Sequence, residues 1–358
     1  MVKMTDSTYT GKYGSLRAMS TSLLGNGFYE QASGKSPEEV LKMLSETRYR
    51  KQIDELSQLY QMPDLFEAVI NATLAKSLQE AYVAMPPLAQ PFVKAYISKW
   101  DIENIKVVLS SKAMGYELTD TSHFMLAVKN PVGILAGSIS KQDYANLLAQ
   151  KDVVSAVNYL AKFGYGTVLM SHIDDYAKNG SLAPMLTELG FYYYTHLAES
   201  LRFYKGDEGP VYECVIAMID AENVLNAAKA SYSGMQDIQQ FVIKGGSISA
   251  SQITEALSGK APESFSRLMG DSTPDSLSRY VAAGKLSELE AILKRSLYKK
   301  FVPTFSASSQ SLSYIMGYIL RLESERDALR ALLLQGYYGI KANFALYAHN
   351  EAVKQDGS

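Results

Sequence analysis

The sequence predicts an all-α protein built from three similar helical domains. Apolar residues recur at spacings of three and four, whereas the alternating pattern of a β-strand is scarce. Prolines and glycine pairs are few and lie between the apolar-periodic stretches. A helix of one design also occurs three times along the chain. With 47% apolar and 20% charged residues, the 358-residue chain has enough material for packed cores.

The first legible helix start is at Ser36. Its hydroxyl suits an N-cap, Pro37 suits the first helical position, and Glu39 completes a capping box. The predicted helix then carries Val40, Leu41 and Leu44 on one face. Capping also accounts for Gly34-Lys35-Ser36, which resembles the end of a phosphate-binding loop. Such a loop needs a glycine where the sequence has Tyr29, and it needs a preceding strand.

Joints and a core helix follow further along. Prolines predict breaks at residues 86, 87 and 91 and at Pro303, and glycines predict joints at 25–27, 206–209 and 245–246. A helical stripe predicts a long core helix; it comprises Leu286, Leu289, Ile292, Leu293 and Leu297.

The repeated helix has an acid fourteen residues before a glycine. The three pairs are Asp101 and Gly115, Asp220 and Gly234, and Glu325 and Gly339. Each helix has a matching apolar face: Ile105, Val108 and Leu109; Val224, Ala227 and Ala228; and Leu329, Leu332 and Leu333. We interpret the acid as a first-turn charge that suits the helix dipole, and the glycine as a left-handed C-cap.

A second similarity links Gly137-Ser138-Ile139-Ser140 to Gly246-Ser247-Ile248-Ser249, each ahead of an amphipathic stretch. Repeats of this length are whole domains, because solenoid periods are about 20 to 50 residues. The sequence therefore predicts modules at 1–118, 119–236 and 237–358. The third helix has Ala328 where the others have Asn104 and Asn223. Chance resemblance among amphipathic helices is the alternative.

No catalytic constellation is found. The net charge of −2 argues against nucleic-acid binding. Two acids two apart on a helix, such as Asp101 and Glu103, point in different directions and do not converge on one site. Cys214 has no cysteine partner and is expected to be a buried thiol. The four histidines lack metal-ligand spacing; they are His123, His172, His196 and His349. We expect no cofactor, no metal and no small-molecule substrate.

One surface feature remains, a basic cluster on the predicted helix around residues 286–300. It comprises Lys294, Arg295, Lys299 and Lys300. It is either a solvated face or an electrostatic docking patch for an acidic partner or for lipid headgroups.

No apolar stretch approaches the roughly 20 residues that a membrane-spanning helix requires. The N-terminal stretch to Tyr13 also lacks the apolar region of a secretory signal. We therefore expect a soluble, cytoplasmic protein whose contact with any membrane is peripheral.

Several segments resemble one known family. Residues 13–19 read YGSLRAM, residues 44–49 read LSETRY, residues 101–106 read DIENIK, and residues 323–330 read ESERDALR ahead of Gly339. In order and spacing they resemble the C subunit of archaeal A-type ATP synthases, the relative of the d subunit of vacuolar ATPases. Arg326-Asp327-Ala328 departs from the family pattern, which places an apolar residue and then Asn after the leading acid.

The resemblance implies a funnel-shaped protein with pseudo-threefold symmetry and no active site of its own. It implies a peripheral subunit of a rotary A-type or V-type ATPase that caps the cytoplasmic face of the membrane rotor ring of proteolipid subunits and receives the central-stalk subunits, so that rotation passes through it during ion transport. Two alternatives stand beside it: a helical scaffold unrelated to ATPases, and a helical enzyme or small-molecule binder with a site assembled from scattered residues.

Overall fold

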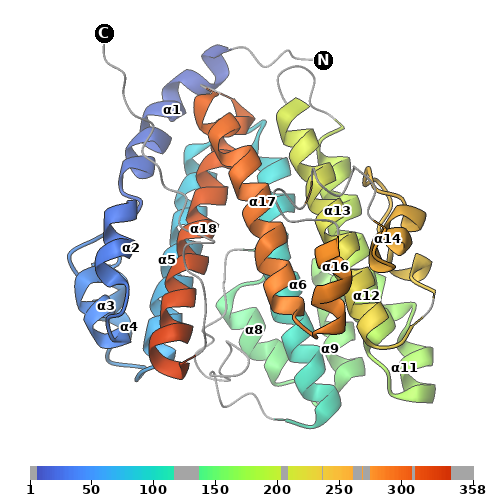
Figure 1. Cartoon of the computed structure of the whole chain (residues 1–358). Helices are drawn as coiled ribbons and strands as arrows, with labels where there is room; N and C mark the ends of the chain where they lie inside the picture. The colour runs from blue at the N-terminus through green and yellow to red at the C-terminus, as the bar shows by residue number, and fades with distance from the viewer. Residues whose placement is uncertain are drawn as a thin grey trace. The chain divides into compact units, whose positions relative to one another are not determined.

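The structure, a computed structural model, describes residues 6–116, 137–202, 209–235, 237–260, 268, 275–308 and 311–339. Across these ranges every regular element is a helix, and no strand is present (Figure 1). The predicted all-α class is confirmed.

The element order repeats one pattern three times, in which short helices precede a pair of long ones. The first set is α1 (Asp6–Thr21), α2 (Asn26–Ala32), α3 (Pro37–Leu44) and α4 (Arg50–Leu56), then α5 (Asp64–Ala84) and α6 (Gln90–Met114). The second is α8 (Lys141–Leu148), α9 (Val153–Leu160), η1 (Ala161–Phe163), α10 (Tyr165–Met170) and α11 (Ile173–Asn179), then α12 (Ala183–Ser200) and α13 (Gly209–Tyr232). The third is η2 (Gln239–Phe241), α14 (Ala250–Leu257) and α16 (Asp275–Ala282), then α17 (Leu286–Ala307) and α18 (Leu312–Tyr338).

By compactness the chain divides into two units. Unit 1 comprises Met1–Thr10 and Tyr194–Arg321, and unit 2 comprises Gly11–Tyr193 and Leu322–Ser358. The helices α12 and α18 each continue from one unit into the other. The three module boundaries stay a prediction; the one between residues 118 and 119 lies outside the described residues, as does residue 236.

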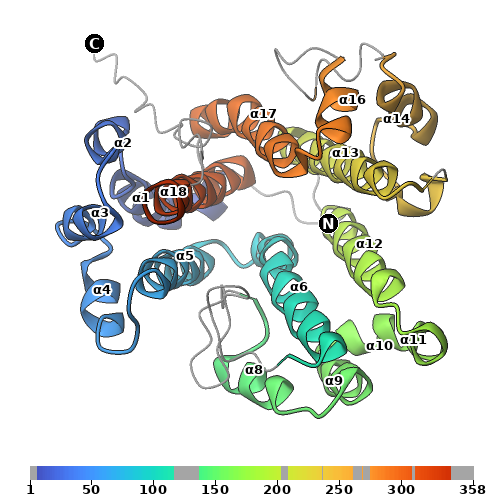
Figure 2. The ribbon, with the colours of Figure 1, turned by 60° about the horizontal axis from the view of Figure 1, so that its bottom comes forward.

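Each unit has its own apolar core. In unit 1, α13 packs against α14, α16 and α17, and Figure 2 shows α13 beside α17. That core includes Val224, Ala227, Ala228, Ile253, Leu289 and Leu293. In unit 2, the C-terminal part of α18 joins the core of α2, α3 and α5 through Ala328, Leu329, Leu332 and Leu333. The three predicted apolar faces of the repeated helix are therefore buried, as expected.

Several local predictions are confirmed. Ser36 and Glu39 form a capping box at α3, with the Ser36 N–H donating to Glu39 Oε2 at 2.9 Å and the Glu39 N–H to Ser36 Oγ at 3.3 Å. The prolines at 86 and 87 lie between α5 and α6, and Pro91 lies in the first turn of α6. The stripe from Leu286 to Leu297 packs on the core of unit 1.

The predicted break at Pro303 is wrong, because Pro303 lies inside α17. Proline removes one backbone hydrogen bond from a helix. Here the turns on either side are held by the buried side chains of Phe301, Val302 and Phe305, with the two phenyl rings 5.7 Å apart. Side-chain packing outweighs the local helix-breaking tendency.

In the parts of the chain that the structure describes, none of the helices combines the length and apolar character needed to span a bilayer.

Candidate functional site

The three repeated acids lie in the middle of long helices and not in their first turn. Asp101 is on α6, Asp220 on α13 and Glu325 on α18, and their exposed fractions are 0%, 3% and 1%. The first-turn interpretation is wrong because each helix extends further toward its N-terminus than the acid-led segment suggests. A buried carboxylate far from a helix end needs hydrogen-bond donors from elsewhere in the fold.

Asp101 finds its donors on the segment that leads into α8. The backbone N–H of Ser138 donates to Oδ2 at 2.6 Å and its hydroxyl at 2.9 Å, and the N–H of Ile139 donates to Oδ1 at 3.4 Å. The hydroxyls of Tyr144 on α8 and Tyr165 on α10 add bonds of 2.9 and 3.2 Å. This single carboxylate therefore joins α6 to α8 and α10.

Burial dominates the electrostatics of this group. It raises the pKa of Asp101, although the hydrogen bonds from Ser138, Tyr144 and Ile139 oppose the shift. Burial, together with the neighbouring carboxylate, also raises the pKa of Tyr144 and of Tyr165. Both tyrosines are therefore neutral donors throughout the physiological range.

Glu325 on α18 has a cationic donor. The guanidinium of Arg48 donates to Oε1 from Nη2 at 2.6 Å and from Nε at 3.2 Å, and the Tyr49 hydroxyl donates to the same oxygen at 2.7 Å. The backbone N–H of Leu24 donates to Oε2 at 2.6 Å. The acid thereby connects α18 to the residues that precede α2 and α4.

Asp220 on α13 has fewer donors. The hydroxyl of Ser247 donates to Oδ2 at 2.5 Å, and the N–H of Ile248 donates to Oδ1 at 2.9 Å. Nearby, Asn223 exchanges two hydrogen bonds with the backbone of Ile243, at 2.7 and 2.9 Å.

The three acids make one contact in common, which we call the carboxylate contact. In each case the acceptor is the mid-helix acid, and one donor is the backbone N–H of a buried apolar residue directly before the N-cap of a short helix. These residues are Leu24 before Gly25 (α2), Ile139 before Ser140 (α8) and Ile248 before Ser249 (α14). The same contact thus occurs three times, at corresponding places in the element order.

Sequence reasoning found both halves of this contact but did not join them. It identified the acids, and it identified the repeated Gly-Ser-Ile-Ser segment. The signal that could have joined them is glycine: a Cβ on Gly137 would lie 2.2 Å from the Asp101 carboxylate, and one on Gly246 would lie 2.4 Å from Asp220 Oδ1. Only glycine lets the backbone approach the acid so closely.

The glycines that close the repeated helices have the expected conformation. Gly115, Gly234 and Gly339 have φ angles of 70°, 78° and 65°. At the first, the N–H of Tyr116 returns to the Ser111 carbonyl at 2.9 Å, and at the second the N–H of Met235 returns to that of Ala230 at 3.0 Å. The predicted left-handed C-caps are confirmed.

A polar network joins α18 to α5 and α6 within unit 2. Arg330 donates from Nε to Glu67 Oε1 at 2.9 Å, and Arg326 donates to Asn71 Oδ1 at 3.1 Å. Glu323 accepts from the Tyr96 hydroxyl at 2.9 Å and from Lys99 Nζ at 2.7 Å.

Two of these residues explain other features of the sequence. The Lys99 ammonium group also lies 5.0 Å from the ring centroid of Trp100. Arg326, where the sequence departs from the expected pattern, makes a buried structural contact with Asn71.

Comparison with known proteins gives this arrangement a family. A model of the family described as ATP synthase (C/AC39) subunit matches residues 13–344. The chain belongs to the ATP synthase (C/AC39) subunit family.

Relatives in this family carry one name. The A-type ATP synthase C subunit of Thermoplasma acidophilum is 33% identical over 94% of this chain and 96% of its own length. That of Thermoplasma volcanium is 34% identical over 91% and 94%, and that of Haloquadratum walsbyi is 26% identical over 88% and 91%.

Membership in the C/AC39 family confirms the expectation of a stalk subunit of a rotary ATPase and does not favour an unrelated scaffold. The family is one of structural subunits, so the expectation of a chain without its own active site is also confirmed. Its partners are other subunits of the ATP synthase, a membrane-associated complex.

The predicted basic cluster of this family member lies on α17. Arg295, Lys299 and Lys300 are exposed, whereas Lys294 is partly buried and lies 3.1 Å from Glu290 Oε1. The ammonium group of Lys300 is 4.9 Å from the ring centroid of Phe301. Arg295 and Lys299 lie one helical turn apart, and they are the part of the cluster best placed for an outside partner.

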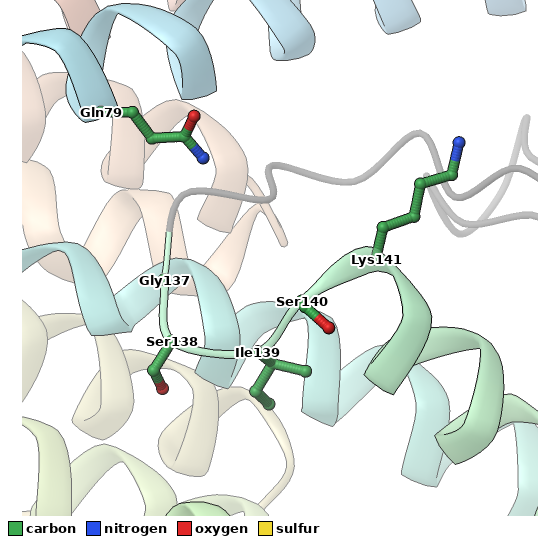
Figure 3. Close-up of a pocket in the computed structure, with 6 residues that line it drawn as sticks. All are labelled: Gln79, Gly137, Ser138, Ile139, Ser140 and Lys141. Carbon is green, nitrogen blue, oxygen red and sulfur yellow. The ribbon is translucent and has the colours of Figure 1, made fainter.

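A recess of about 420 Å³ lies beside the Asp101 contact, between Gln79 on α5 and residues 137–141. In Figure 3 the side chains of Gln79 and Lys141 lie on one side of the segment, and those of Ser138 and Ile139 point to the other. The second side faces Asp101, to which Ser138 donates. The recess itself brings together no acid–base pair and no nucleophile.

The remaining candidates suggest no further chemistry. Cys214 is buried on α13, as predicted. His172 lies 3.8 Å from Glu188, and His123 and His349 lie outside the described residues. Over the described ranges, no three His, Cys, Asp or Glu side chains are grouped as metal ligands. Asp101 is buried whereas Glu103 is exposed, so this acid pair diverges as expected.

Proposed function

We propose that this chain couples the central stalk of an A-type or V-type ATPase to the rotor ring of the membrane sector. In this role it sits at the cytoplasmic face of the membrane as a peripheral subunit, and rotation passes through it during ion transport. Membership in the C/AC39 family supports the role, and the carboxylate contact, repeated three times, is the structural observation that carries it.

The contacts follow a cycle when they are assigned to the predicted modules. Asp101 of the first module binds residues that open the second, and Asp220 of the second binds residues that open the third. Glu325 of the third module binds Leu24, Arg48 and Tyr49 of the first. A cycle of this kind is what a funnel of three modules about a pseudo-threefold axis requires.

A connector that transmits torque must not yield between its parts. Packed helices with native-like density resist deformation, and charge-assisted hydrogen bonds between elements add directional restraints. Buried carboxylates that bind the start of the next module supply such restraints, whereas the sequence provides no groups for chemistry of its own.

The test is assembly and coupling. The tagged chain, expressed with the other subunits of its ATPase, is expected to co-purify with both stalk and ring subunits. Complexes that lack it are expected to hydrolyse ATP without ATP-driven ion transport. Full transport without this chain, or purification with neither stalk nor ring, contradicts the proposal.

The basic cluster on α17 is the proposed partner-binding patch. Changing Arg295 and Lys299 to Glu reverses two exposed charges without touching the core. We expect weaker assembly with an unchanged melting temperature of the isolated protein. Reversal of Arg50 and Lys51, exposed on α4 and each paired with an acid one turn away, is the control. Assembly unaffected by the first change removes the patch.

A further inference from the structure

The three carboxylate contacts are unequal in their polar donors. Asp101 accepts five hydrogen bonds, from the backbone and hydroxyl of Ser138, the backbone of Ile139, and the hydroxyls of Tyr144 and Tyr165. Glu325 accepts four, two of them from the Arg48 guanidinium. Asp220 accepts two within the described residues, from Ser247 and Ile248.

The difference has an identifiable origin in sequence. Tyr144 is the fourth residue after the N-cap Ser140 of α8, and its hydroxyl reaches Asp101. The fourth residue after the N-cap Ser249 of α14 is Ile253, which has no donor and is buried in the core of unit 1. The third contact has therefore exchanged a tyrosine donor for apolar packing.

What holds α14 to α13 is accordingly non-directional. The α13 side of the shared core is rich in small residues: Ala221, Ala227, Ala228 and Ala230. Apolar contact fixes no particular register, and packed helices accommodate motion by small sliding displacements. Hydrogen bonds to a carboxylate, in contrast, oppose sliding because they depend on direction.

The backbone also provides a pivot beside this contact. Asn223 holds the chain at Ile243 through two hydrogen bonds. Between that anchor and the carboxylate contact lie Gly245, with φ of 102°, and Gly246. Two adjacent glycines give the backbone the freedom to turn once the contact at Ser247 and Ile248 opens.

We propose that the Asp220 contact is the releasable one of the three. The segment 247–249 with α14 detaches from α13 and turns about Gly245 and Gly246, while the Asp101 and Glu325 contacts stay closed. This inference rests on the proposed three-module connector: one joint adjusts, for example when a partner docks, and the other two stay fixed.

Hydrogen exchange of the isolated, full-length chain tests the order of opening. The amide protons of Leu24, Ile139 and Ile248 each donate to one of the carboxylates, so their protection factors report the three contacts directly. We expect the Ile248 amide to be at least about tenfold less protected than the other two, because its acid has fewer charge-assisted bonds.

A matched pair of mild variants sharpens the test. Ser247→Ala removes one of the two donors to Asp220, whereas Ser138→Ala removes one of the five donors to Asp101. The first is expected to lower the protection of Ile248 by about three- to tenfold, and the second to lower that of Ile139 by less than about twofold. Neither change creates a buried cavity, since both serines lie on exposed turns.

Equal or greater protection at Ile248, or equal responses to the two serine variants, overturns the proposal. Exchange on the isolated chain is independent of assembly with other subunits. Failure here therefore leaves the proposed coupling role intact, and failure of co-purification leaves the order of opening intact.

Discussion

At the residue scale, two glycines occupy space that a side chain would share with a carboxylate. A methyl group on Gly137 would lie 2.2 Å from Asp101, and one on Gly246 would lie 2.4 Å from Asp220 and 3.2 Å from Ile219. The acids are buried, so they cannot turn toward solvent to make room.

Gly246→Ala is therefore expected to lower the free energy of unfolding by about 1–3 kcal/mol, as overpacking does. Gly190→Ala is the control, because Gly190 lies within α12 and a Cβ there would meet no atom within 4 Å beyond its own stretch of helix. That change should leave stability unchanged or raise it by up to about 1 kcal/mol. Urea denaturation measures both, and an unaltered midpoint for Gly246→Ala would show that the close approach to Asp220 is absent.

The buried Asp101 carboxyl gives stability a distinctive pH dependence. Burial raises its pKa in the folded state above the value of 3.8 for a free side chain. The folded protein then binds this proton before the unfolded chain does as pH falls. The stability contributed by Asp101 therefore increases as pH falls through the raised pKa, and it levels off below 3.8.

Comparison with Asp101→Asn isolates this effect as a difference in unfolding free energy between the two proteins, measured from pH 7 downward. The wild type should gain on the variant as the pH falls. Asp152→Asn is a control of opposite sign, because the hydrogen bond from Ser155 lowers the pKa of Asp152 and its contribution is lost on acidification. Parallel curves for wild type and Asp101→Asn would refute the assignment.

At the element scale, α18 depends on charges that its neighbours satisfy. Glu325→Gln removes the partner of the Arg48 guanidinium, which lies 2.6 Å away, and leaves that cation nearly buried. We expect a loss of about 3–5 kcal/mol of unfolding free energy. Glu288→Gln breaks an exposed pair with Lys285 and should cost less than about 1 kcal/mol. Thermal melts distinguish them, and similar shifts would mean that the Glu325 contact is exposed in solution.

The same helices show what the sequence could predict. Helix starts and ends were accessible because caps are local: Ser36 with Glu39, and Gly115 with its positive φ, act on neighbouring residues. Apolar faces such as Ile105 and Val108 were accessible because burial follows helical period.

The partners of the acids were not accessible in this way. Leu24 and Glu325 are 301 positions apart, and nothing in local spacing joins them. Pro303 failed for the same reason, because the buried phenylalanines that hold α17 together act through the tertiary fold. Long-range packing decides what local propensity leaves open.

At the scale of the whole molecule, α12 and α18 each belong to both compact units. A continuous helix does not melt in one half without fraying the other, because helix formation is cooperative. We therefore expect a single calorimetric transition on heating.

Variants in the two units provide the check. Asp101→Asn acts in unit 2 and Asp220→Asn acts in unit 1. Each should shift the same single peak, with calorimetric and van't Hoff enthalpies in agreement. Two peaks, each moved by one variant only, would show that the units melt independently.

The position of Trp100 has a practical consequence. It is the chain's one tryptophan, it directly precedes Asp101 on α6, and the Lys99 ammonium group lies over its ring. Excitation at wavelengths that tyrosine does not absorb therefore selects a single fluorophore next to the first buried acid. The molecule carries its own optical reporter there, and changes in emission on acidification or on mixing with other subunits can be assigned to one known place without any added label.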